Sequence, residues 1–237
     1  MFYITGDTHG DFSRIERFCN AMNPPPSDTL IILGDAGINF YGGLRDAYRK
    51  ERLAQLPITL FSIHGNHEMR PGTIASYHTT EWYGGQVYVE DDFPNLLFAV
   101  DGEVYDLDGI QTMAIGGAYS IDKYYRLSHG WGWWPDEQPS PAIKEKVERV
   151  LAARDWEIDV VLSHTTPLRY EPVECFIPDI DQSKVDKSTE EWLGTIEAKL
   201  KYQHWYCGHY HTEKTVDKLI MLFNSIRSFE AEEHHDG

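Results

Sequence analysis

The chain alternates short apolar runs with longer segments in which apolar residues recur at helical spacing. Apolar runs of about four to eight residues predict β-strands, and they lie at 1–5, 29–34, 58–65, 95–100, 110–117, 159–164, 205–208 and 219–224. Several of these runs are apolar at nearly every position, a pattern typical of strands that are covered on both faces of a sheet.

Amphipathic helices are predicted between these strands. Their apolar residues fall on one helical stripe, and the segments are 11–23, 44–56, 140–155 and 188–202. Ser140 and Pro141 form a typical N-cap and first helical residue, and Ser188 with Glu191 forms a capping-box pattern. Strands and helices alternate at both ends of the chain, with consecutive strands in the middle. This order predicts an α/β fold with mixed sheets inside and helices outside, in a single domain over 1–237.

Two long segments, 119–140 and 165–187, show no clear period. Loops of this length in a compact domain are often functional. The first contains the sequence GWGWW at 130–134. This stretch could stack on a nucleobase or anchor a lid through buried tryptophans.

Composition narrows the class of protein. A hydrophobic content of 41% in 237 residues is enough for a buried core, and no apolar run approaches the roughly 20 residues of a membrane helix. The N-terminus has no signal-peptide pattern. Cys19, Cys175 and Cys207 have no CxxC spacing and suit free thiols in a reducing cytoplasm, with Cys207 expected to be a packed strand residue. The net charge of −17 argues against long nucleic-acid duplexes as partners.

Residues of metal-ligating type recur where the predicted strands end. They are Asp7, His9, Asp35, Asn66, His67, His164, His209 and His211. Because ligands of open α/β sheets bind at the carboxyl ends of strands, we expect these side chains to meet. In Asp-x-His and His-x-His, the first and third residues share one side if the segment is extended. Mixed oxygen and nitrogen donors suit Mn, Fe or Zn.

Glycines precede these polar residues at four of the strand ends, at positions 6, 34, 65 and 208. Glycine permits a sharp turn and a close approach of the backbone to an ion or a phosphate. Each motif alone has an ordinary explanation as a turn or a helix cap. Turn chemistry gives no reason for five such strand ends in one chain, so the set as a whole predicts a metal site.

As a set, GDTH at 6–9, GD at 34–35, GNHE at 65–68, a strand-terminal His164 and GHYH at 208–211 resemble the calcineurin-like metallophosphoesterases. The resemblance implies a four-layer α-β-β-α sandwich of two mixed sheets flanked by helices, with a dinuclear metal centre, Mn being the favoured ion. It implies that one ion is held by Asp7, His9 and His211, that the other is held by Asn66, His164 and His209, and that Asp35 bridges both. It also implies that His67 faces the leaving group as general acid, that Glu68 orients His67, and that Asn66 contacts the substrate. Tyr210 is expected to be a packing residue.

The chemistry implied is attack on phosphorus by a metal-activated hydroxide. The substrate stays open between a phosphomonoester, small or on a protein, and a phosphodiester in a nucleotide, dinucleotide or short RNA or DNA. A non-catalytic phosphoester-binding protein is a third alternative. Two branches of the family share motifs with this chain. The serine/threonine protein phosphatases are similar in GDTHG and GNHE, but GDAGINFYGG lacks the arginine of their second motif. The branch of RNA lariat debranching enzymes is similar in GNHE, IGGAYSIDKYYR and SHTTP. Arg126 and Arg45 are candidate phosphate contacts, with surface solvation as the alternative role.

Overall fold

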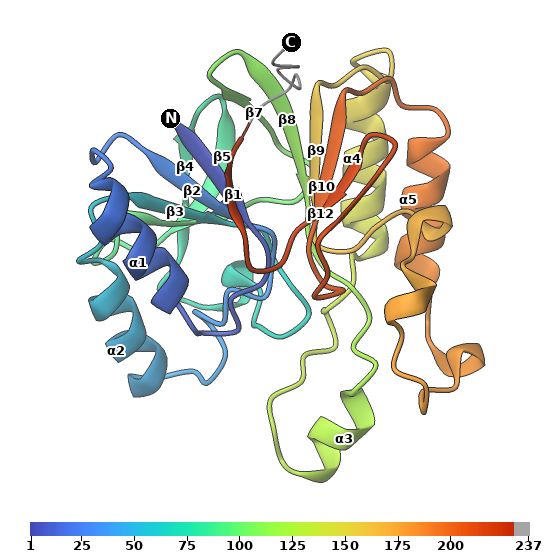
Figure 1. Ribbon diagram of the computed structural model, residues 1–237, viewed down its shortest axis with the longest axis horizontal. Coiled ribbons are helices and arrows are strands. Elements are labelled where there is room, and N and C mark those ends of the chain that lie inside the picture. The colour runs from blue at the N-terminus through green and yellow to red at the C-terminus, as the bar shows by residue number, and fades with distance from the viewer. Residues whose placement is uncertain (230–237) are drawn as a thin grey trace.

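Two mixed β-sheets pack against each other between two layers of helices (Figure 1). The computed structural model describes residues 1–229. The first sheet has the strand order β13 (Ile226–Ser228), β1 (Phe2–Thr5), β2 (Thr29–Ile32), β3 (Thr59–Ser62), β6 (Leu96–Ala99), β5 (Gly85–Val89) and β4 (His78–Trp82). The second has the order β11 (Lys214–Val216), β12 (Leu219–Met221), β10 (His204–Cys207), β9 (Val160–Ser163), β8 (Ile110–Ile115) and β7 (Val104–Leu107).

Each sheet has a parallel centre and antiparallel edges. Strands β1, β2, β3 and β6 run parallel in the first sheet, and β12, β10, β9 and β8 run parallel in the second. Helices α1 (Ser13–Met22) and α2 (Leu44–Leu53) cover the first sheet, whereas α4 (Pro141–Ala152) and α5 (Ser188–Glu197) cover the second (Figure 1). The predicted four-layer α-β-β-α architecture is therefore confirmed.

The hydrophobic core has three parts, each packed between two adjacent layers of the four-layer sandwich. Alternate residues of one strand face different layers, as β1 shows: Ile4 packs between the two sheets with Phe61 and Leu162. Its neighbour Tyr3 belongs to the cluster under α1 with Ile15. A third cluster fills the space between the second sheet and helices α4 and α5. Burial on both faces explains why the central strands read as continuous apolar runs.

The strands that were not predicted from the sequence lie at the edges of the sheets or, for β5, next to an edge. β4 is largely exposed, so it shows no apolar run. Its hairpin with β5 turns at Tyr83 and Gly84, which have φ of 47° and 81°, and β7 turns into β8 at Asp108 and Gly109, with φ of 55° and 90°. Positive φ at both turn residues is typical of the two-residue hairpin turns that match strand twist.

Other local expectations had mixed outcomes. The Ser140 cap is confirmed, because its side chain accepts a hydrogen bond from the Ile143 N–H. The capping box at Ser188 is wrong: Ser188 is already helical, and its N–H donates to the Asp186 side chain. The segment 119–140 contains a short helix, α3 (Lys123–Ser128), which projects beyond the sheets (Figure 1). The segment 165–187 contains 3-10 turns at Leu168–Tyr170, Val173–Cys175 and Gln182–Lys184.

Two further expectations concern membranes and cysteines. Within residues 1–229, no helix is long and apolar enough to cross a membrane. Cys207 is a buried residue of β10, as predicted, and Cys19 is also buried, while Cys175 is exposed; all three are free thiols.

Candidate metal centre

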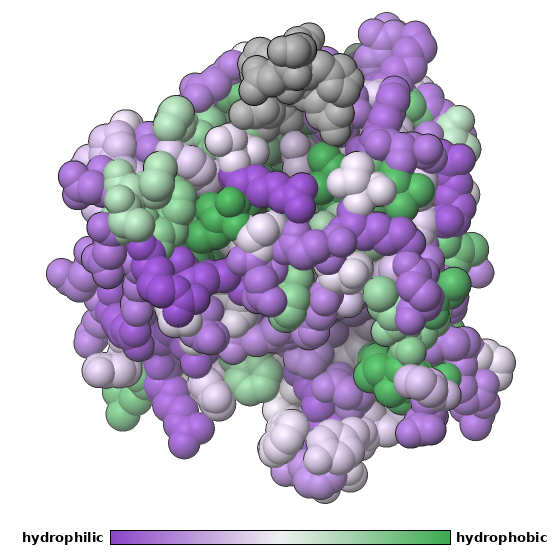
Figure 2. Space-filling model, in the orientation of Figure 1, coloured by the Kyte–Doolittle hydropathy of each residue, from purple (hydrophilic) through white to green (hydrophobic). Residues whose placement is uncertain are grey.

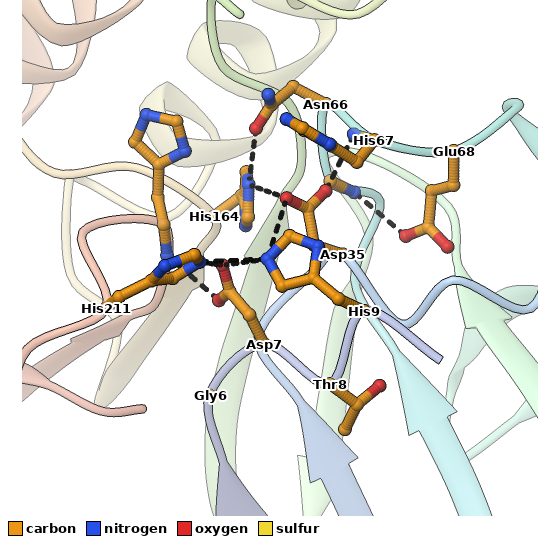
Figure 3. A network of polar contacts seen from close by, with 12 residues as sticks. Gly6, Asp7, Thr8, His9, Asp35, Asn66, His67, Glu68, His164 and His211 are labelled. Carbon is orange, nitrogen blue, oxygen red and sulfur yellow. Dashed lines mark hydrogen bonds and ion pairs between the residues drawn. The ribbon is translucent and has the colours of Figure 1, made fainter. Parts of the chain in front are cut away.

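The eight predicted polar residues lie where the parallel strands of the two sheets end, and all of them except His209 are labelled in Figure 3. Strands β1, β2 and β3 are neighbours in the first sheet, and β9 and β10 are neighbours in the second. Their carboxyl ends lie together because both sheets are parallel at the centre. The topology thus brings together the side chains that follow each strand.

One half of the cluster is formed by Asp7, His9 and His211. The Nε2 atoms of His9 and His211 are 2.8 Å apart, and Asp7 Oδ2 lies 3.3 Å from His211 Nε2 and 3.7 Å from His9 Nε2. Asp7 is buried, whereas both histidines are partly exposed at the rim. Three possible ligand atoms therefore surround one point on the open side of the site.

The other half lies deeper and contains Asp35, Asn66 and His164. His164 Nε2 is 2.8 Å from Asn66 Oδ1 and 3.6 Å from Asp35 Oδ2. Asp35 Oδ2 also lies 3.8 Å from His9 Nε2, so this carboxylate faces both halves of the cluster. The His209 ring packs edge-on against that of His164, with centroids 5.0 Å apart. Asp35 thus lies between His9 on one side and His164 on the other.

The backbone at the site adopts conformations that non-glycine residues rarely take. His9, Asp35, His209 and His211 have φ of 46°, 48°, 66° and 50°. The segments Asp7–His9 and His209–His211 are therefore not extended, and the expectation that they project like strand residues is wrong. Strain of about 1–3 kcal/mol at each such residue persists only where the surrounding structure enforces it, which is typical of functional sites.

Three of the four glycines before these residues make room for side chains of the cluster. A Cβ atom on Gly34 would lie 2.1 Å from His164 Nδ1, one on Gly65 would lie 2.0 Å from Asp35 Oδ1, and one on Gly208 would lie 2.2 Å from Asp7 Oδ1. These three glycines thus let side chains of the cluster approach the backbone closely.

The charges of the cluster suit a cation. Burial alone would raise the pKa of Asp7, but the neighbouring imidazoles of His211 and His9 outweigh it and lower that pKa. The pKa of Asp35 is also well below its usual range, because the charge of His164 and its hydrogen bond outweigh burial. Burial, followed by the charge of His164, lowers the pKa of His209 to about 3, so this imidazole is neutral. Two charged carboxylates and a neutral imidazole are the protonation states that metal ligands require.

His164 is oriented for metal binding by its second nitrogen. Its Nδ1 lies 2.8 Å from the Leu33 carbonyl, to which it donates, so Nε2 points into the cluster. Burial opposes its charge, but the charge of Asp35 raises the pKa of His164 to about 9. Binding of a cation at Nε2 would release this proton.

A buried oxygen that makes no hydrogen bond provides the direct test of fit. Asp7 Oδ2 has no hydrogen-bond partner among the described residues, while Asp7 Oδ1 accepts the His209 N–H at 2.9 Å. An unpartnered buried carboxylate oxygen is costly unless a cation meets it. The residues present therefore fit a metal ion, and the mixed donors fit Mn, Fe or Zn.

His67 lies at the rim, and its partner is not the predicted one. The backbone N–H of His67 donates to Asp35 Oδ1 at 2.7 Å. Its ring Nε2 lies 3.5 Å from Asp122 Oδ1. Glu68 is fully buried and accepts the Gly65 N–H at 3.1 Å, pointing away from the imidazole in Figure 3. Asp122, from the 119–140 segment, thus holds the place assigned to Glu68. Burial, with the Asp35 charge, raises the pKa of Glu68 to about 8.

Arg126 is buried, so the alternative role of a solvated surface residue is wrong. It is 1% exposed and donates through Nη1 to Ser120 Oγ at 3.2 Å. Ser120 Oγ in turn accepts a 2.9 Å hydrogen bond from Asn66 Nδ2. Arg126 therefore supports Asn66 through Ser120, and it does not line the cavity at the site. Arg45 is exposed over the Tyr41 ring, outside that cavity.

A cavity of about 490 Å³ opens beside the cluster. His67, His209 and His211 lie on its metal side, and the 165–187 segment supplies much of the opposite wall through Cys175, Phe176, Ile177, Gln182 and Val185. In Figure 2, where most of this face of the molecule is hydrophilic, apolar side chains gather at the lower right over this segment. The length of this segment indicated from the sequence only that such loops are often functional, and it did not identify these wall residues.

Comparison with known proteins agrees with this arrangement. A family model described as calcineurin-like phosphoesterase matches residues 1–213, and no curated protein matches the chain. The crystal structure of TT1561 of Thermus thermophilus is 11% identical, with a TM-score of 0.51 over 98% of each chain. The phosphopantetheinyl hydrolase PptH from Mycobacterium tuberculosis is 14% identical, with a TM-score of 0.52 over 100% of this chain and 98% of that one. Identities this low show a shared fold, and the family match carries the assignment: the chain belongs to the calcineurin-like phosphoesterase family.

Proposed function

We propose that the protein hydrolyses phosphomonoesters with the help of two metal ions, with Mn favoured. One ion would be held by Asp7, His9 and His211, the other by Asn66, His164 and His209, with Asp35 shared. When bound, such a pair lowers the pKa of a water molecule and offsets the charge of the phosphate. The observation that carries the proposal is the convergence of two buried carboxylates with histidine Nε2 atoms around the unpartnered Asp7 Oδ2, beside a cavity.

The protein's own groups would position the substrate and supply the proton. His67 lines the cavity, and its side chain is 26% exposed, so it can reach the departing oxygen. Burial lowers the pKa of His67, whereas the charges of Asp35 and Asp122 favour its protonated form. Asn66 is held by Ser120 and Arg126, which fixes its carbonyl oxygen toward the cluster. A positioned acid of this kind contributes about 10²–10⁴-fold to a rate.

The tryptophan-rich loop gives no support to a nucleic-acid substrate at this cavity. Trp134 packs against Phe40, with ring centroids 5.6 Å apart, and Arg126 lies over its ring. Trp133 donates to the Glu137 carboxylate at 2.7 Å. No tryptophan is among the described residues that line the cavity. These contacts favour the anchored-loop interpretation over base stacking.

The test combines metal content with turnover. The metal-replete protein should hydrolyse p-nitrophenyl phosphate faster than bis-p-nitrophenyl phosphate, whereas the reverse order would support a phosphodiesterase. Asp35→Asn should lose most bound metal, measured by mass spectrometry, and nearly all activity. His67→Ala should keep the metal and lose about 10²-fold or more in kcat. His78→Ala, an exposed histidine on β4, is the matched control and should change neither. Two ions per chain in Asp35→Asn would refute the bridging role.

A further inference from the structure

We infer that the cavity receives the leaving group of the substrate, and that Glu190 on its wall selects leaving groups with an apolar body and a hydrogen-bond donor or positive charge. The inference rests on the proposed phosphoester hydrolysis and names its substrate class. Leaving groups that carry a further phosphate should be disfavoured. The general acid His67 lines the same cavity, which makes this the side on which the departing oxygen leaves.

Glu190 is a wall residue with one unpartnered oxygen. It lies in the first turn of α5, is 4% exposed and lines the cavity. Its Oε1 accepts a 2.7 Å hydrogen bond from Thr165 Oγ1, whereas Oε2 is buried without a hydrogen-bond partner among the described residues. A buried carboxylate oxygen left in this way costs free energy unless a ligand satisfies it.

The neighbouring hydroxyl groups cannot satisfy that oxygen. Thr165 uses its single proton for Glu190 Oε1, so the Tyr210 hydroxyl, 3.0 Å from Thr165 Oγ1, is the donor in that contact. Tyr210 is therefore more than a packing residue, because it completes the chain of hydrogen bonds that fixes Glu190. This chain joins the GHYH motif directly to the substrate wall.

The other carboxylates of the cavity have partners within the protein. Glu171 accepts a hydrogen bond from Lys187 Nζ at 2.7 Å, and Asp186 accepts the Ser188 N–H at 3.0 Å. Asp122 Oδ1 also lacks a hydrogen bond, but it lies 3.5 Å from His67 and 3.8 Å from Arg126. Within residues 1–229, Glu190 has no cation at ion-pair distance. It is thus the lining carboxyl group that is free to meet a donor on a ligand.

The remaining wall determines the rest of the specificity. Its apolar members are Ile121, Phe176, Ile177 and Val185, and Phe176 stacks on Tyr210 with centroids 6.3 Å apart. These side chains would cover an apolar body. No Lys or Arg is among the described lining residues, so a second phosphate would meet carboxylates and no compensating cation.

The test compares three phosphomonoesters of one chain length: hexyl phosphate, 6-aminohexyl phosphate and hexane-1,6-diyl bisphosphate. Burial raises the pKa of Glu190 to about 7, so assays are run at pH 8 with Mn-loaded enzyme. Since a hydrogen bond to a charged group is worth about tenfold or more, kcat/KM for the amine should exceed that for hexyl phosphate by about tenfold. The bisphosphate should be the poorest. A wild-type enzyme that prefers the bisphosphate, or treats all three alike, overturns the inference.

Two variants locate the selectivity. Glu190→Gln keeps the acceptor for Thr165 and removes the charge, so the amine-to-hexyl ratio should fall to within about twofold of unity. Glu191→Gln changes the exposed neighbour in the same helical turn and should keep the wild-type ratio. An unchanged ratio in Glu190→Gln refutes the assignment to this residue.

Failure of the proposed function would look different. If no ester is turned over by metal-replete protein, hydrolysis fails, and binding then tests the cavity separately. Calorimetry should show tighter binding of 6-aminohexylphosphonate than of hexylphosphonate, and Glu190→Gln should remove the difference. Equal affinities in the wild type overturn the inference.

Discussion

Replacing Gly65 by alanine should displace the carboxylate that lies between the two halves of the metal centre. The added Cβ would lie 2.0 Å from Asp35 Oδ1 and 2.1 Å from the Asp35 backbone nitrogen. Since real Cβ atoms keep at least 3.0 Å from such atoms, one partner must move by about 1 Å. Gly65 is not among the glycines with positive φ, so the collision, and not backbone strain, is what the substitution tests.

The expected loss follows from that displacement. The same Asp35 oxygen accepts the His67 N–H at 2.7 Å, so the bridging carboxylate and the general acid would move together. A misplacement of about 1 Å costs on the order of 10²-fold in rate, and overpacking costs about 1–3 kcal/mol in stability. We expect kcat/KM on p-nitrophenyl phosphate to fall at least 10²-fold, with weaker metal binding, in a protein that still folds.

Gly194→Ala is the matched control. Gly194 lies in helix α5, and its added Cβ would have Leu168 N, at 3.9 Å, as its nearest neighbour. Alanine in a helix is favoured over glycine by about 0.5–1 kcal/mol, so this variant should be slightly more stable and fully active. A folded Gly65→Ala protein with wild-type metal content and turnover would refute the position given to Asp35. If Gly65→Ala does not fold, Gly208→Ala applies the same test to Asp7, whose Oδ1 would lie 2.2 Å from the new Cβ.

Two further predictions concern the loop and the pH dependence of stability. Trp134→Ala should remove the packing on Phe40 and Arg126, lower the free energy of unfolding by about 2 kcal/mol and expose 119–140 to limited proteolysis. Trp131 is exposed, so Trp131→Ala should change neither stability nor proteolysis. Equal protease resistance of the two variants would contradict the prediction. Burial raises the pKa of Glu190 from 4.5 to about 7, so the native state holds a proton that the unfolded chain has lost. The free energy of unfolding should therefore fall by about 3 kcal/mol as pH rises from 4.5 to 7, relative to Glu190→Gln. Urea unfolding at pH 4.5 and pH 8 measures this, and a pH-independent difference between the two proteins would contradict it.

The ligand cluster could be predicted because its information is local. Each polar residue follows an apolar strand within a few positions, and parallel strands place their carboxyl ends together whatever the loops do. The central strands could also be predicted, because burial on both faces leaves continuous apolar runs. The edge strand β4 could not, because its exposed residues have no reason to be apolar. The two hairpins could have been predicted from the pairs Tyr83–Gly84 and Asp108–Gly109, because two-residue hairpin turns favour residues that tolerate positive φ.

The second layer of the site could not be predicted, because it depends on packing between distant segments. Arg126 looks like a surface cation in sequence, and its burial follows only from contacts with Ser120 and Trp134. Glu190 reads as an ordinary acidic residue in the first turn of a helix. Its role emerges only when Thr165, 25 residues away in the chain, occupies one of its two oxygens. Sequence spacing carries no trace of such pairings.

The glycines show how the motif and the architecture depend on each other. Gly34 follows a strand of the first sheet and makes room for His164 of the second, while Gly208 follows a strand of the second sheet and makes room for Asp7 of the first. Both contacts cross the interface between the sheets. A side chain at either glycine would hold the carboxyl ends of the sheets apart, and ligands from separate sheets could then no longer share one site. Gly34 and Gly208 are therefore each required by a ligand that faces them from the other sheet, so these two glycines link the two-sheet fold to the metal centre.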